Sequence, residues 1–180
     1  SFALATFGYL ALTTSTPLLV MVGRLDEGMS HLILLAVPLF IFAGELLAEG
    51  GVGKRIVEFA RVLFGWLPGG LGVVTVISCT LFGGVSGSAI ADTAAIGSLV
   101  IPAMVARGYS RGFAAALLAV AGTVALLMPL SIPFLVYAFI SGVSMRTLSM
   151  AGLLPALATA VALIVMCMWH GKKTGVDNGE

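Results

Sequence analysis

The stretch GGVSGS at residues 83–88 combines flexible glycine backbone with the hydroxyl groups of Ser86 and Ser88, and Asp92 follows four residues later. Glycine adopts backbone angles that other residues disfavour, and hydroxyl and carboxylate oxygens are ligands that hard cations prefer. Asp92 lies about one turn into the helix expected after the break, where a helix N-terminus stabilises negative charge. This pattern favours a binding site for a cation or a small anion.

A second break is expected at MPLSIP, residues 128–133. Pro129 and Pro133 each lack a backbone N–H and clash with the preceding turn, so we expect the helix to be unwound there. Unwound carbonyl groups inside a membrane coordinate sodium in secondary transporters. Ser131 lies between the two prolines and adds a hydroxyl group.

Each feature also has a purely structural interpretation. The glycines and serines could serve only close helix packing, the prolines could only kink a helix, and Asp92 could only cap one. Two breaks in succession, with an acid beside one of them, favour the functional interpretation over three unrelated structural ones.

The surrounding sequence is that of an integral membrane protein. It is 59% hydrophobic and 9% charged, whereas soluble domains have about 25% charged residues. A spanning helix needs about 20 apolar residues, and the uncharged runs at 2–23, 62–91, 112–145 and 147–171 are long enough. Alternating polar and apolar stretches are few, so we expect an all-helical protein rather than a barrel. The net charge of +1 predicts no nucleic-acid partner.

The apolar segments differ in length, and the length of each predicts whether it crosses the membrane once, turns back within it or is broken. The two arms of 70–106 hold roughly 15–19 residues each, or about 22–28 Å, slightly short of the ~30 Å membrane core. We therefore expect a re-entrant hairpin there. The run at 112–145 would be about 51 Å long as a helix, which fits one broken span. The run at 2–22 has no basic start and no cleavage site, so we expect a span rather than a signal peptide.

Residues 52–64 are expected to form an amphipathic helix on the membrane surface. Lys54, Glu58 and Arg61 share its polar face. Its apolar stripe consists of Val52, Ile56, Phe59, Ala60 and Leu63. The expected units are scaffold-type helices at 1–69, including a span at 32–48, a transport-type unit at 70–145, and a final span with a polar tail at 146–180.

The basic residues test this topology. If 70–106 is a hairpin, one side of the membrane holds seven of them and the other holds Arg24 and Arg146. The seven are Lys54, Arg55, Arg61, Arg107, Arg111, Lys172 and Lys173. If 70–106 crossed once, the split would be four against five, with no bias. The positive-inside rule therefore favours the hairpin, with its base on the cytoplasmic side.

At the two breaks the sequence resembles the large membrane subunit of tripartite ATP-independent periplasmic (TRAP) transporters. The matching stretches are VPLFIFAGELLAEGG at 37–51, LFGGVSGSAIADTAAIGSLVIPAM at 81–104, GYSRGFAAAL at 108–117, PLSIPFLVYAFISGVS at 129–144 and LSMAGLLPAL at 148–157. The resemblance covers about residues 1–170. The family's subunit is longer, so the chain is similar to its N-terminal half.

The resemblance implies a sodium-driven elevator-type importer of a small organic anion in the bacterial inner membrane. It implies two partners, a periplasmic substrate-binding protein and a small membrane subunit. Sodium ions would be the coupling ions, with no other cofactor. An alternative is a sodium/anion carrier of a related inverted-repeat family that needs no binding protein.

The resemblance also implies a set of ligands. One family sodium site uses a Ser-Gly-Ser stretch and carbonyl groups of a Gly-x-x-apolar-Pro segment. The matching positions here are Ser86, Gly87, Ser88, Ala125, Met128 and Pro129. The sequence departs from the family at two positions. Residue 125 is alanine where the family usually has glycine, and residue 130 is leucine where the family usually has the second proline of Pro-Pro-Ser, which ends here at Ser131. Alanine can offer its carbonyl group, but its backbone is less permissive.

Two other classes of function are less favoured. GVSG at 84–87 superficially matches the Gly-x-Ser-Gly of rhomboid intramembrane proteases. A serine nucleophile needs a base within reach, and His31 and His170 are both expected at membrane boundaries, so we do not expect an enzyme. A purely structural scaffold would show no effect of cations on its stability. Cys79 and Cys167 lie singly in apolar helices and are expected to be buried small side chains.

Overall fold

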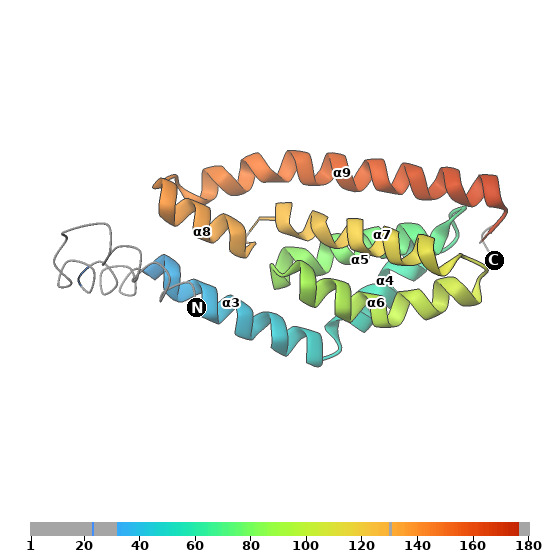
Figure 1. Cartoon of the computed structure of the whole chain (residues 1–180), viewed down its shortest axis with the longest axis horizontal. Coiled ribbons are helices and arrows are strands. Elements are labelled where there is room, and N and C mark those ends of the chain that lie inside the picture. Colours follow the sequence, from blue (N-terminus) through green and yellow to red (C-terminus); the bar gives the residue numbers. More distant parts are fainter. Residues whose placement is uncertain (1–22, 24–31, 130, 177–180) are drawn as a thin grey trace, which may run out of the picture.

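The computed structural model describes residue 23, residues 32–129 and residues 131–176, and it describes side chains from residue 36 onward within the second of these ranges. The predicted span at 2–22 and residues 24–31 lie outside the described residues. The described part contains helices and no strands, which agrees with the all-helical prediction (Figure 1). The helices are α3 (Leu32–Glu49), α4 (Val52–Phe64), α5 (Gly70–Ser86), α6 (Ala89–Ala106), α7 (Arg111–Val124), the 3-10 turn η1 (Ala125–Leu127), α8 (Ile132–Ser141) and α9 (Met145–Thr174).

Three described segments are long and apolar enough to cross a membrane. These are Ala89–Ala106, Arg111–Ser141 and Met145–Thr174. A fourth would be the pair formed by α3 and α4, which is bent by 64° between Glu49 and Val52. The predicted final span corresponds to α9, which begins at Met145, one residue before the start of the predicted 146–180 unit.

The helices α5 and α6 pack side by side and antiparallel, as the arms of a hairpin. Gly87 and Ser88 join them. Gly87 has a left-handed backbone with φ 63°, and its N–H donates to the Gly83 carbonyl over 3.0 Å. In Figure 1 the tip of the hairpin lies near the middle of the molecule, while α9 runs along the whole length of the hairpin and on toward α8. The hairpin therefore returns to the end from which it started.

The second break lies beside this tip, between α7 and α8 (Figure 1). The regular α-helix ends at Val124, and a 3-10 turn at Ala125–Leu127 precedes the predicted break. Pro129 has no N–H for the Ala125 carbonyl, and this carbonyl instead accepts the N–H of Met128 over 3.2 Å, which tightens the chain into a 3-10 turn. Pro133 lies in the first turn of α8, where no N–H is needed. Of the described residues between η1 and α8, Met128, Pro129 and Ser131 are non-helical.

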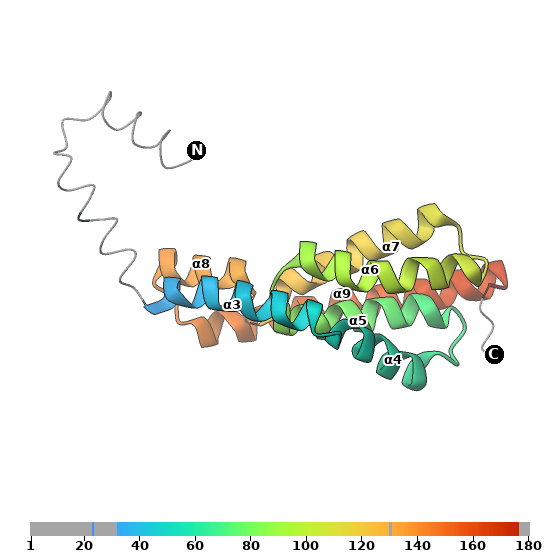
Figure 2. The same cartoon turned by 90° about the horizontal axis from the view of Figure 1, so that it is seen from below.

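The predicted apolar stripe of α4 is divided between two environments. Gly53 and Ala60 are buried against the hairpin, and Val52 and Ile56 join the core there. The small side chains at these positions let α4 lie close to α5. Phe59 and Leu63, at the other edge of the stripe, are exposed. Figure 2 shows α4 leaving the direction of α3 on one side of the bundle.

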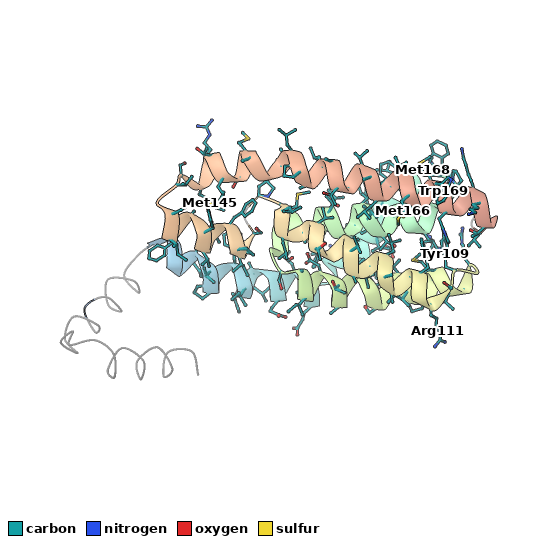
Figure 3. All side chains as sticks on the ribbon, turned by 45° about the horizontal axis from the view of Figure 1, so that its top comes forward. Tyr109, Arg111, Met145, Met166, Met168 and Trp169 are labelled. Carbon is teal, nitrogen blue, oxygen red and sulfur yellow. The ribbon has the colours of Figure 1, made fainter. Side chains whose placement is uncertain are left out.

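The starts of α5 and α7 meet the end of α9 at the base of the hairpin. Gly69 lies against Cys167 and Gly171, and the ring of Phe113 stacks on His170 with the ring centroids 4.0 Å apart. Figure 3 shows Arg111 and Trp169 at this end and Met145 at the opposite one.

Four of the described basic residues lie at the base of the hairpin. Arg61 and Arg107 line one cavity at the base, and Lys172 and Lys173 end α9 there. Lys54 and Arg55 lie in the first turn of α4, where the preceding Gly53 is beside Ile96 of α6.

Candidate functional site

Ser86 and Asp92 meet across the tip of the hairpin. The Oγ of Ser86 donates a hydrogen bond to Oδ1 of Asp92, and the N–H of Ser88 donates to the same Oγ over 3.3 Å. Ser86 is 1% exposed and Asp92 is 0% exposed. The left-handed Gly87 makes this possible, because it turns the chain back within one residue. The Ser86 hydroxyl is therefore held in one orientation by both arms.

The second carboxylate oxygen of Asp92, Oδ2, is buried and has no hydrogen-bond partner among the described residues. It lies where three elements converge. A Cβ atom built on Gly83 would lie 2.8 Å from Oδ2 and would overlap the methyl group of Ala125. Gly83 belongs to α5, Asp92 to α6 and Ala125 to η1, so the acid of the hairpin faces the start of the broken helix.

A carboxylate oxygen that is buried without a hydrogen-bond partner destabilises the folded protein, because it has lost its hydrogen bonds to water. The cost is about 1–3 kcal/mol for a neutral polar group and more for a charged one. A cation or a proton would relieve this cost. The two predicted breaks therefore lie next to each other. The polar group without a partner between them is the carboxylate of Asp92. This geometry suits a hard cation better than a second anion.

Ser88 has a different position. Its Oγ accepts the N–H of Ala91 over 3.4 Å, which caps α6. Ser88 also lines a cavity of about 590 Å³ between α3 and α6. The other residues that line it are Glu45, Ala48, Glu49, Ile90, Ala91, Ala94 and Ala95. Ser88 is thus accessible from outside the hairpin, whereas Ser86 is enclosed.

The predicted residues of the second break mostly serve the break itself. The Ser131 N–H donates to the Met128 carbonyl over 3.2 Å, and its Oγ donates to the Leu126 carbonyl over 2.8 Å. Ala125, Met128 and Ser131 are buried and Pro129 is half-buried. Of these residues, Ala125 is the one that the structure brings against Gly83 and the Asp92 side chain.

Three further residues support the site, and the sequence analysis did not assign them a role. Gly44 of α3 approaches the tip, where a Cβ atom would lie 3.3 Å from the Ser86 carbonyl oxygen. Gly122 of α7 lies against Thr93 of α6, with no room for a Cβ atom between them. Single glycines inside apolar helices are the signal that could have found both, since such glycines often mark close helix contacts.

The sequence was compared with known protein families. Residues 1–180 match the family described as "Tripartite ATP-independent periplasmic transporter, DctM component". The chain belongs to the DctM family. It is therefore a component of a transporter and not an enzyme, as the sequence analysis expected.

Several curated TRAP permeases are similar to the chain. It is 43% identical over 142 residues to the isethionate TRAP transporter permease protein DctMQ of Oleidesulfovibrio alaskensis, which covers 79% of the chain and 22% of the relative. It is 43% identical over 135 residues to the C4-dicarboxylate TRAP transporter large permease protein DctM of Vibrio cholerae, covering 75% and 30%. It is 36% identical over 175 residues to the sialic acid TRAP transporter large permease protein SiaM of Vibrio cholerae, covering 97% and 41%. The chain spans less than half the length of each of these relatives.

Gly83 and Ala125 lie in contact where the hairpin meets the second break. Glycine is the residue that the resemblance leads us to expect at position 125. The methyl group of Ala125 occupies the space that Gly83 leaves open on α5. The alanine is therefore accommodated by the facing glycine, and its carbonyl group stays at the start of the break.

Proposed function

We propose that the chain is part of the permease of a sodium-coupled secondary transporter that imports small organic anions delivered by a periplasmic binding protein. The observation that carries this proposal is the unpartnered Oδ2 of Asp92, buried where the hairpin meets the broken helix. Membership of the DctM family supports the transporter class. The buried acid supports coupling to a cation.

In this proposal the hairpin is re-entrant and its tip lies within the membrane. Two features support this placement: the tip lies near the middle of the molecule (Figure 1), and the 30-residue α9 is about 45 Å long, more than enough to cross a ~30 Å core. The basic base of the hairpin would face the cytoplasm. The protein would then lie in the bacterial inner membrane, with α4 near its cytoplasmic surface.

Sodium is the cation we propose. Oδ2 of Asp92 would be a ligand, with carbonyl groups at Ala125, Met128 and Pro129 as the further candidates, because oxygen donors suit a hard cation. Ser86 would orient the carboxylate from Oδ1. The first amides of α6 have no partner within the helix, so the carboxylate of an organic anion would bind near Ser88, at the tip.

The proposed partners follow from the family. The family description is tripartite and periplasmic, which supports a periplasmic binding protein and a small membrane subunit. The three relatives are named for isethionate, a C4-dicarboxylate and sialic acid. We propose a small organic anion of this kind as the substrate.

The test of coupling is the thermal stability of the full-length protein in sodium and in potassium at constant ionic strength. A ligand that binds the folded state raises its stability by mass action, so sodium should raise the melting temperature of the wild type more than potassium does. Asp92→Asn should lose this difference, while Ser98→Ala, an exposed hydroxyl on the same helix, should keep it. An equal response of Asp92→Asn and the wild type would refute the cation site.

Uptake into proteoliposomes tests the partner. With an inward sodium gradient, transport should require the periplasmic binding protein. Transport without it would favour the alternative, a sodium/anion carrier that works alone. Asp92→Asn should abolish uptake in either case, so the two questions are answered separately.

A further inference from the structure

A groove opens between the end of α6 and the start of α7, at the base of the hairpin. Its volume is about 580 Å³. The residues that line it are Ile101, Pro102, Val105, Ala106, Arg111 and Ala115. All of them except the arginine are apolar. The groove is separate from the site at the tip, because Asp92 lies at the opposite end of α6.

Arg111 is the charged group of this groove. Its side chain is exposed, and Figure 3 shows it directed away from the helices. It forms no ion pair with any residue that the structure describes, and none of the described acidic residues lines the groove. A guanidinium group presents a planar fork of N–H donors that matches the oxygens of a phosphate. The groove therefore presents a positive charge that no described residue neutralises.

The groove lies where two candidate membrane spans meet. The segment Ala89–Ala106 ends there, and the segment Arg111–Ser141 begins there. Because the first span runs toward this point and the second runs away from it, Arg111 lies at the membrane surface and Ile101 and Ala115 lie deeper. In the proposed topology this is the cytoplasmic surface, where the leaflet carries anionic lipids.

We propose that this groove binds one phospholipid with an anionic headgroup, its phosphate on Arg111 and one acyl chain along Val105, Pro102 and Ile101. A free phosphate ion would use the arginine and leave the apolar lining uncovered. The volume of about 580 Å³ also lies within the ~300–1,000 Å³ of sites that hold larger ligands. Basic pockets between membrane helices bind anionic headgroups in this way. The proposal rests on the membrane placement given under the proposed function, but not on the cation site.

The test of the headgroup uses the full-length protein in detergent, with dioctanoyl phosphatidylglycerol as the probe and dioctanoyl phosphatidylcholine as the zwitterionic comparison. Binding is followed by native mass spectrometry and by the shift in melting temperature. The wild type should bind phosphatidylglycerol more tightly than phosphatidylcholine. Arg111→Gln should weaken the binding of phosphatidylglycerol about fivefold. Arg111→Lys keeps the positive charge and should retain most of the preference.

A second pair of variants tests the acyl chain. Ala115→Phe places a ring in the groove and should weaken the binding of both lipids. Ala116→Phe adds the same ring at the next residue of α7, which is exposed and does not line the groove. This control should leave both affinities unchanged. The lipid preference of the wild type needs no variant, so it remains informative if a variant fails to fold.

Two further controls separate this site from general charge effects and from the cation site. Arg146→Gln removes a positive charge at the opposite end of the molecule, where α9 begins, and should leave lipid binding unchanged. Arg111→Gln should keep the sodium-specific rise in melting temperature that the wild type shows. A failure of the lipid site would therefore not resemble a failure of the cation site.

Four outcomes would overturn the proposal. The first is equal binding of the two lipids by the wild type. The second is an equal loss of binding in Arg111→Gln and in Arg146→Gln. The third is an equal effect of Ala115→Phe and Ala116→Phe, which would mean that the acyl chain does not lie in the groove. The fourth is a stabilisation by inorganic phosphate as large as that by phosphatidylglycerol, which would identify a site for a free anion instead.

Discussion

Gly83 of α5 lies directly against Ala125 of the broken helix, with no space between them for a second methyl group. Gly83→Ala should therefore force the hairpin away from η1 and lower the free energy of unfolding by about 1–3 kcal/mol, the usual cost of overpacking. Thermal unfolding of the full-length protein measures this. Gly84→Ala, the next residue along, adds a methyl group where nothing lies within 4 Å, and it should be nearly neutral.

The same contact can be tested by compensation. Ala125→Gly in the Gly83→Ala background removes the overlapping methyl group and should restore part of the lost stability. Only part is expected, because the new Cβ atom would still lie 2.7 Å from the Ala125 Cα atom. Additive effects of the two substitutions would show that the two residues are not in contact.

Gly122 makes the corresponding contact between α7 and α6. A Cβ atom there would overlap Oγ1 of Thr93, so Gly122→Ala should cost about 1–3 kcal/mol of stability. Gly112→Ala on the same helix meets nothing within 4 Å and should cost less or stabilise the helix slightly. The melting temperatures of the two variants provide the comparison. Equal values would mean that α6 and α7 are farther apart than the structure shows.

The sequence was sufficient to predict two helices joined by a short break at the hairpin tip. Glycine and serine at 83–88 predict a break by their local preferences, but α5 continues to Ser86 and only Gly87 and Ser88 interrupt the helices. Asp92 falls in the first turn of the next helix, as counting along the sequence predicts. The hydrogen bond between Ser86 and Asp92 joins residues only six positions apart. Local spacing therefore carried most of the information about this half of the site.

What the sequence did not predict depends on contacts between distant segments. The pairing of Gly83 with Ala125 joins residues far apart in the chain, and no local pattern encodes it. The hydrogen bond that the Ser131 hydroxyl group donates to the Leu126 carbonyl within the break was not predicted either. The apolar stripe of α4 looked uniform, yet Ala60 is buried and Phe59 is exposed, because the position of α5 decides which edge is covered.

The backbone of Gly87 gives a prediction that separates stability from function. Its φ of 63° is left-handed, so Gly87→Ala should cost about 1–2 kcal/mol. Gly142 has a similar φ of 67° at the end of α8, and Gly142→Ala should cost about the same. The sodium response of the melting temperature should decrease in Gly87→Ala alone, since only Gly87 lies at the hairpin tip. A decrease of the same size in both variants would mean that the tip geometry has no special role.

Replacing Ser86 and replacing Ser88 should affect different properties, although the two residues are only two positions apart. One should change the response to sodium and the other the stability in any salt. Ser88 caps α6, so Ser88→Ala should lower stability by about 0.5–2 kcal/mol equally in sodium and in potassium. Ser86 donates to Oδ1 of Asp92, so Ser86→Ala leaves the carboxylate without its orienting partner and should reduce the sodium-specific part of the stabilisation. Melting curves of both variants in the two salts measure the difference. If Ser88→Ala instead removed the sodium response and Ser86→Ala kept it, the cation would lie on the side of the α3–α6 cavity, and the assignment of Oδ2 as its ligand would be wrong.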